Sequence, residues 1–127
     1  MINWDHYPNF TRAEFECQCG CGNAAMSPTF MDKLQQIRTA YGKAMTITSG
    51  YRCPDHNANV SSTGRDGPHT TGRAADIGVS HADAKRLLAL GTIHFTGIGV
   101  KQKGSGRFLH FDDLTAPSHP RPNVWSY

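Results

Sequence analysis

Apolar residues recur at helical spacing after Ser27-Pro28, a pair that supplies an N-cap and a first-turn proline. Four of them fall on one face of a helix: Phe30, Leu34, Ile37 and Tyr41. Gly42 follows at a position where helices commonly end. The pattern predicts a helix over residues 28–41, with its apolar stripe facing the core.

Two further helices are predicted from capping boxes, in which Ser or Thr precedes an acidic residue by three positions. Thr11 to Glu14 starts a short helix, and Ser80 to Asp83 opens a helix that runs to about Leu90. Residues 53–68 are rich in Asn, Ser, Gly, Asp and Pro, which predicts a long loop. Residues 117–127 contain three prolines and are expected to pack as irregular chain.

Short runs of strand-forming residues predict a sheet. Residues 45–48 and 74–79 each read as a strand. Residues 97–100 and 108–112 flank Gly104-Ser105-Gly106 and predict a hairpin. The expected fold is α+β: a small, mainly antiparallel sheet carries the functional residues on one face, and two to three helices cover the other.

Size and charge narrow the classes of function. The chain has 127 residues, which fits a single domain over residues 1–127. Its net charge of +3 comes from scattered basic residues, so we expect no nucleic-acid binding. No apolar run could span a membrane, and the N-terminus does not resemble a secretory signal. We therefore expect a monomer made in the cytoplasm, without membrane insertion.

Three residues offer the donor types of a hydrolytic zinc site. His69 and Asp76 lie seven positions apart, and His110 lies in the last predicted strand. Such a site takes three protein ligands and leaves one position open. Imidazole and carboxylate groups suit Zn²⁺, which lowers the pKa of bound water to about 7. His69, Asp76 and His110 are therefore the candidate ligands.

Two charged residues are candidates for catalytic roles. Asp112 lies two residues after His110 on the same strand face, so its carboxylate can act as the base that accepts a proton. Arg52 follows a strand exit and can stabilise an oxyanion, a contribution of about 3 kcal/mol for a well-placed donor. A purely structural salt bridge is the alternative role for Arg52.

The four cysteines form a second group of interest: Cys17, Cys19, Cys21 and Cys53. Reduced thiols are the default in a cytoplasmic protein. Residues two apart on an extended segment point the same way, so clustering near Cys53 is geometrically allowed. Free thiols, a disulfide and a second metal site stay open, although the spacing is not that of a C-x2-C knuckle.

Five blocks of sequence, taken in order, resemble those of a known family: Phe15–Gly22, Ile47–Pro54, His69-x2-Gly72-x-Ala74-x-Asp76, Gly97–Gly99 and Phe108–Asp112. The chain looks like a family M15 peptidase over residues 15–112. These are zinc D,D-carboxypeptidases and peptidoglycan endopeptidases, which include phage endolysins and share a fold with hedgehog signalling domains. The resemblance therefore implies a hydrolase that uses zinc.

The resemblance also implies roles for the site residues, with the family arginine at Arg52 and the ligands at His69, Asp76 and His110. Other branches place a carboxylate three residues before the last ligand, where this chain has Arg107. Some use an H-x-H arrangement, whose second position is Asp112 here. Asp112 is therefore the base candidate; alternatively it is a ligand or supports a ligand while His110 acts as base. Gly67 replaces a usual Ser, which removes a hydrogen bond but no ligand.

The resemblance implies hydrolysis of a peptide bond in bacterial peptidoglycan by an endolysin-like or virion-associated phage protein that acts at the cell wall. D-Ala-D-Ala carboxypeptidase, L-alanyl-D-glutamate endopeptidase and D,D-endopeptidase activities all fit. One alternative is a zinc-containing but non-catalytic wall-binding or virion structural module, which Arg107 would favour. Another treats the cysteines as the main metal centre and the His/Asp set as incidental.

Overall fold

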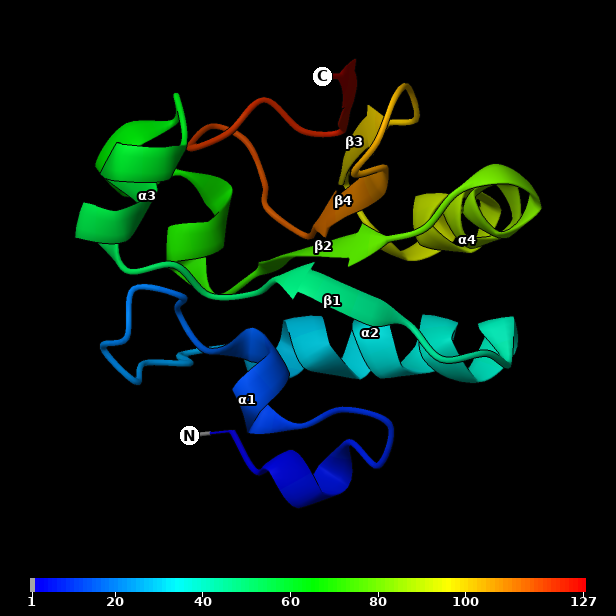
Figure 1. Cartoon of the computed structure of the whole chain (residues 1–127), viewed down its shortest axis with the longest axis horizontal. Helices are drawn as coiled ribbons and strands as arrows, with labels where there is room; N and C mark the ends of the chain where they lie inside the picture. Colours follow the sequence, from blue (N-terminus) through cyan, green and yellow to red (C-terminus); the bar gives the residue numbers. More distant parts are fainter. Residues whose placement is uncertain (1) are drawn as a thin grey trace.

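Residues 2–127, the part that the computed structural model describes, form one five-stranded sheet with helices packed against it (Figure 1). The strands are β1 Thr46–Ser49, β2 Ala74–Gly78, β3 Gly97–Lys101, β4 Phe108–Asp112 and β5 Asn123–Ser126. Their order across the sheet is β1-β2-β4-β3-β5. All neighbours pair antiparallel except β3 and β5, which run parallel. The predicted α+β fold with a mainly antiparallel sheet is confirmed.

The helices over the described residues are α1 Arg12–Phe15, α2 Pro28–Tyr41, α3 Pro54–Val60 and α4 His81–His94. The start of α2 is capped as predicted, since the Ser27 hydroxyl accepts a hydrogen bond from the backbone N–H of Phe30. The capping box of α1 also forms. Helix α4 begins where predicted but continues four residues past Leu90.

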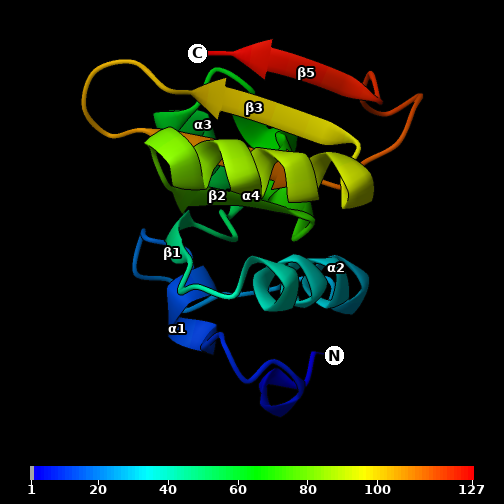
Figure 2. The same cartoon turned by 90° about the vertical axis from the view of Figure 1, so that its right-hand side faces the viewer.

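Alternation along β2 and β4 divides their side chains between the two faces of the sheet. Ile77, Leu109 and Phe111 are buried in the core that α2 and α4 help to form. Helix α4 lies above α2 in Figure 2 and contacts both α2 and β4. Gly91 allows this close approach, because a Cβ there would lie 2.3 Å from the Phe111 ring. The opposite face is left for the intervening polar residues.

The prediction of a long loop over residues 53–68 is wrong. The segment contains α3, whose N-cap is Cys53 and whose first turn holds Pro54. A 3-10 turn, Gly64–Asp66, follows it. The fully buried Asn57 amide donates to the Thr63 hydroxyl at 2.9 Å, which ties the helix to the chain after it. The burial and hydrogen bonding of Asn57 thus stabilise a helix in a segment whose composition is typical of loops.

The prediction of an irregular tail is also wrong, because residues 123–126 form β5 along the edge of β3. The backbone N–H of Asn123 donates to the Thr96 carbonyl at 2.9 Å, and that of Tyr127 donates to Val100 at 3.2 Å. Backbone groups make these bonds, and the strand is largely exposed. The prolines and the absence of an apolar pattern explain why the sequence did not predict this strand.

Candidate metal centre and active site

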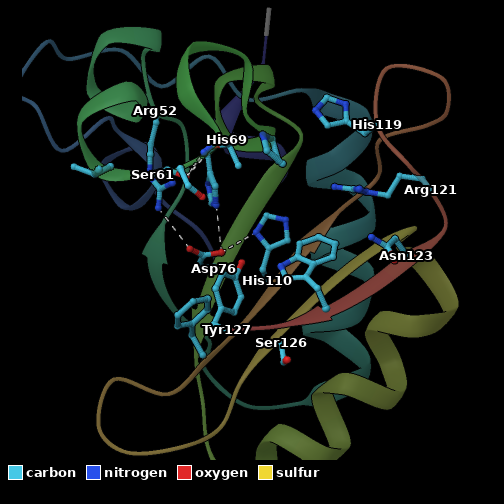
Figure 3. Close-up of a pocket in the computed structure, with 16 residues that line it drawn as sticks. Arg52, Ser61, His69, Asp76, His110, His119, Arg121, Asn123, Ser126 and Tyr127 are labelled. Carbon is cyan, nitrogen blue, oxygen red and sulfur yellow. Dashed lines mark hydrogen bonds and ion pairs between the residues drawn. The ribbon is translucent and has the colours of Figure 1, made fainter.

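His69, Asp76 and His110 converge on the sheet face opposite α2 and α4 (Figure 3). Asp76 and His110 are direct partners across β2 and β4, and His69 comes from a 3-10 turn, Pro68–Thr71, just before β2. The Asp76 Oδ1 atom lies 3.2 Å from His69 Nε2 and 2.9 Å from His110 Nδ1. All three side chains are buried. The structure thus brings the three predicted ligands together.

The other nitrogen of each imidazole is already engaged. His69 Nδ1 lies 2.8 Å from the Gly50 carbonyl, and His110 Nε2 lies 2.7 Å from Asp112 Oδ2. A carbonyl and a carboxylate can only accept, so each of these nitrogens donates its proton. In the neutral imidazoles the inward nitrogens then carry lone pairs that face the Asp76 carboxylate. A cation between them satisfies all three groups.

The donor spacing fits zinc in particular. Tetrahedral Zn²⁺ with ligand distances near 2.0–2.1 Å places neighbouring donors about 3.3 Å apart. The observed separations of 3.2 Å and 2.9 Å are close to that value. Partners on the outer nitrogens, such as Gly50 and Asp112, orient the rings as is usual for zinc-binding histidines. The residues present therefore fit a zinc ion.

The electrostatics of the site favour an ionised Asp76. Burial raises the pKa of this carboxyl, but hydrogen bonds from His110 and His69 outweigh it and hold the pKa well below its usual range. Burial lowers the pKa of His110, whereas the hydrogen bonds to Asp112 and Asp76 raise it, and the net direction without metal is upward. The site thus attracts positive charge, either a proton or a metal ion.

Asp112 lies behind His110, on the side of the ring away from Asp76. Its carboxylate is fully buried and also accepts two hydrogen bonds from Arg121. Burial raises the pKa of Asp112, but the bonds from Arg121 and His110 lower it to about 2. This placement favours support of His110 over contact with the cavity. Asp113 points to the other face of the strand, where it pairs with Arg73.

Two glycines of β3 make room for this arrangement. A Cβ on Gly97 would lie 2.1 Å from Asp112 Oδ1 and 2.5 Å from Arg121 Nε. A Cβ on Gly99 would lie 2.8 Å from Trp125 Nε1. The Gly97–Gly99 block thus lets the tail fold down onto the site face, a role that its sequence alone does not indicate.

Arg52 stands at the rim of the ligand set. Its Nη2 lies 3.7 Å from Asp76 Oδ2, and its Nη1 donates to the Asn57 side chain at 3.1 Å. Asn57 is fixed by its bond to Thr63. A Cβ on Gly67 would lie 2.1 Å from the Thr63 hydroxyl. The Thr63 side chain therefore occupies the space that a side chain at position 67 would need. Arg52 is thus held in place and reaches the site.

A cavity of about 630 Å³ opens beside the ligands. Residues that the sequence reasoning missed line it: His119, Arg121, Trp125 and Tyr127. The Trp125 ring lies between the Arg121 guanidinium, 4.9 Å from its centroid, and the His110 ring, 5.2 Å away. Trp125 and Tyr127, two aromatic residues two positions apart in the tail, were only a weak sequence signal for this side of the cavity. Arg107 does not line the cavity; its side chain donates to Gly104 in the hairpin.

The chain matches the protein-family model described as Peptidase M15 over residues 8–112. That match spans most of the chain and includes His69, Asp76, His110 and Arg52. No curated protein matches the sequence. Within residues 2–127, no helix is both long and apolar enough to cross a membrane.

Proposed function

The chain belongs to the Peptidase M15 family and is a metallopeptidase, and from that premise we propose that it uses zinc to cleave a peptide bond of bacterial peptidoglycan. Peptidases of this family depend on zinc. The observation that carries the proposal is the convergence of His69 Nε2, His110 Nδ1 and Asp76 Oδ1, with the outer nitrogen of each imidazole already bonded.

His69, Asp76 and His110 would hold the metal. Zinc bound there would supply Lewis-acid chemistry, which polarises a scissile carbonyl and lowers the pKa of water to about 7. The chain contributes the fixed geometry. Gly50 and Asp112 orient the two imidazoles, and the register of β2 against β4 sets Asp76 beside His110.

Arg52 binds the carbonyl oxygen of the scissile bond and stabilises the negative charge that develops on it. Its contact with Asn57 holds the guanidinium at the cavity wall. Tyr127 supplies a second donor, since it lines the same cavity and its hydroxyl points towards Asp76 (Figure 3). The two donors approach from different elements, so a substrate carbonyl lies between them.

Proton transfer falls to a residue other than Asp112, whose carboxylate is enclosed by His110 and Arg121. Asp112 instead positions His110, one of the roles that the sequence left open. His119 lines the cavity and is half-buried. In the proposed mechanism its imidazole accepts the proton of the attacking water and returns it to the leaving amine.

A peptidoglycan peptide is the proposed substrate on three grounds. The family resemblance is to cell-wall peptidases. The cavity volume of about 630 Å³ falls in the range of small-ligand sites and accommodates a short peptide. Arg52 offers a positive charge to the carboxylates of a stem peptide. With this substrate we propose an endolysin-like or virion-associated role at the cell wall.

The test is digestion of purified bacterial walls, with mass spectrometry of the released fragments. The protein is assayed as isolated, after chelation and after zinc is added back, and His69→Ala serves as the inactive control. We expect new amino termini that disappear with the chelator and return with zinc, and their identity names the bond. Absence of release from zinc-loaded protein would overturn the proposal.

One observation favours a second candidate, a zinc-containing wall-binding or virion module without catalysis. Among the described residues that line the cavity, the carboxylate is Asp76, and it belongs to the ligand set. A site without a free carboxylate base suits binding rather than turnover. Co-sedimentation of the zinc-loaded protein with walls, without release of fragments, would support this candidate.

A further inference from the structure

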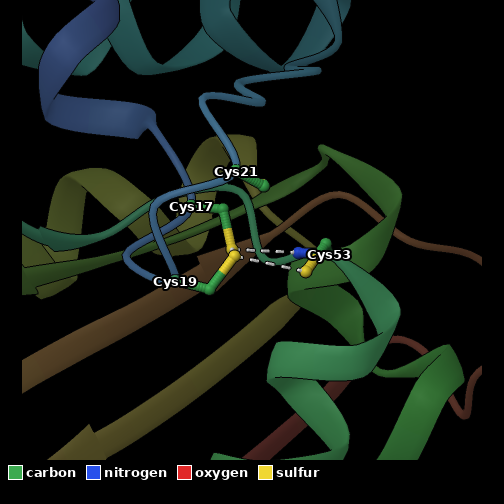
Figure 4. A group of neighbouring side chains, drawn as sticks. All are labelled: Cys17, Cys19, Cys21 and Cys53. Atoms are coloured by element: carbon green, nitrogen blue, oxygen red, sulfur yellow. Dashed lines mark hydrogen bonds between the residues drawn. The ribbon is translucent and has the colours of Figure 1, made fainter.

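The four cysteines gather into one cluster (Figure 4), a group of residues distinct from the His–Asp set. Cys17, Cys19 and Cys21 come from the loop between α1 and α2, and Cys53 precedes α3. Their sulfur atoms all lie within 4.8 Å of one another. Residues separated by more than thirty positions in the sequence therefore meet at one point, which local chain geometry does not require.

The sulfur separations match those of thiolates around a metal. Cys19 Sγ lies 3.4 Å from Cys17 Sγ and 3.6 Å from Cys53 Sγ. Tetrahedral zinc with Zn–S bonds near 2.3 Å separates its sulfurs by about 3.8 Å. A disulfide needs about 2.05 Å between two sulfurs, and all four cysteines are free. One sulfur at similar distances from two others is the pattern of a shared centre, not of a pair.

The surrounding backbone is also arranged for a charged sulfur. The N–H of Cys53 points at Cys17 Sγ, 3.3 Å away. Gly20 and Gly22 adopt positive φ values of 89° and 77°, which lets the loop wrap around the cluster. Cys19 and Cys21 are exposed at this surface.

We propose that Cys17, Cys19, Cys21 and Cys53 form a structural four-thiolate site for a zinc ion, separate from the His–Asp site. Four protein ligands leave no open position, which is the mark of a structural site. Zn²⁺ is bound by four deprotonated thiols, so four protons are released on binding and no electron is transferred.

The site would fix the chain that carries Arg52. Two hydrogen bonds already join the cysteine loop to the segment around β1: Gln18 to the Thr48 carbonyl and Cys53 N–H to Cys17 Sγ. A third joins Tyr51 N–H to the carbonyl of Phe15 at the end of α1. Cys53 directly follows Arg52. A metal shared by both segments therefore holds the strand exit that presents the guanidinium to the cavity.

Cobalt substitution of the full chain under reducing conditions tests the site. Co²⁺ bound by thiolates gives intense sulfur-to-cobalt absorption in the near ultraviolet, which His and Asp ligands do not produce. We expect this absorption in the wild-type protein and in a His69→Ala/His110→Ala variant, and its loss in Cys19→Ser/Cys21→Ser. Zinc should displace the cobalt and abolish the band.

Two results would overturn the proposal. One is cobalt-loaded wild-type protein without sulfur-to-cobalt absorption. The other is fewer than four titratable thiols after unfolding in chelator without reductant, which would reveal a disulfide. The wild-type measurements stand even if a cysteine variant fails to fold. Neither measurement depends on catalytic activity. A protein that shows the sulfur-to-cobalt absorption but does not cleave walls would therefore contradict only the proposed peptidase activity, not the proposed cysteine site.

Discussion

The guanidinium of Arg121 donates two parallel hydrogen bonds to the carboxylate of Asp112, Nε to Oδ1 at 2.9 Å and Nη2 to Oδ2 at 2.8 Å. Both side chains are almost entirely buried, at 5% and 0% exposure. The pair lies against His110 Nε2 and fixes that ring so that Nδ1 faces Asp76. Arg121 in the tail and Asp112 in β4 thus determine the orientation of His110, a proposed metal ligand.

Replacement of Asp112 by Asn tests whether it positions His110 or acts as the base. As a positioning residue, its loss should weaken zinc binding about 10–100-fold, as for other outer partners of metal-binding histidines. Activity should then recover at high zinc concentration. Zinc affinity and activity are measured together by competition with a chromophoric chelator and by wall digestion. Unchanged zinc affinity with activity lost at saturating zinc would assign the base to Asp112.

Replacement of Arg121 by Ala should destabilise the protein by about 3–5 kcal/mol, because the buried Asp112 carboxylate loses its charged partner. Denaturant unfolding of the metal-free protein measures the change. Arg65→Ala is the matched control, since that arginine pairs with Asp55 on the exposed surface, where an ion pair contributes about 0–1 kcal/mol. Equal effects of the two variants would contradict a buried, structural role for Arg121.

Replacement of His69 by Ala should abolish zinc binding at the His–Asp site and peptidase activity together, since one of three ligands is removed. Metal analysis of the purified variant and wall digestion check this. His6→Ala is the control, because His6 is exposed on the N-terminal 3-10 turn and away from the site. Activity that survives without the His–Asp zinc would show that the site is not catalytic.

Replacement of Arg52 by Ala should leave zinc binding intact and lower kcat about 10²–10³-fold, the loss typical of one oxyanion donor. Arg107→Ala, which alters an arginine outside the cavity, is the matched control and should keep wild-type kcat. A fragment-release assay at saturating wall concentration separates kcat from KM. If Arg52→Ala raised only KM, the guanidinium would bind substrate without stabilising charge that develops in the reaction.

The stability of the metal-free protein should fall as pH rises above about 6.5. Hydrogen bonds to Asp112 and Asp76 raise the pKa of His110 above its ordinary value of 6.5. The stabilisation is fully present below pH 6.5 and is lost as pH rises through the raised folded-state pKa. Zinc competes with the proton at Nδ1, so the zinc-loaded protein should not show this decline.

Thermal unfolding from pH 6 to pH 9, with chelator and with zinc, measures this contrast. His6→Gln, which removes an exposed histidine away from the site, is the control and should keep the wild-type dependence of melting temperature on pH. A metal-free melting temperature that stays constant across this range would contradict the proposed charge arrangement around His110.

Local patterns predicted the elements whose stability depends on nearby residues. Helix α2 follows from its Ser27 cap, its Pro28 and its apolar stripe, all within fourteen residues of each other. The β3–β4 hairpin follows from two short apolar runs around a glycine turn. Strand β5 was missed because its partner, the edge of β3, lies far away in the sequence. Helix α3 was missed because a loop-like composition does not show that Asn57 is buried and bonded to Thr63.

The sequence by itself determined the chemical types and the order of the candidate ligands, because the H-x6-D and H-x-D spacings and the family blocks are properties of the chain alone. Only the tertiary structure decided which nitrogen of each imidazole faces Asp76, and that Asp112 lies behind His110 beside Arg121. It also decided that Cys53 meets the three cysteines of the loop. These relations depend on strand register and on contacts between distant segments, which residue spacing does not encode.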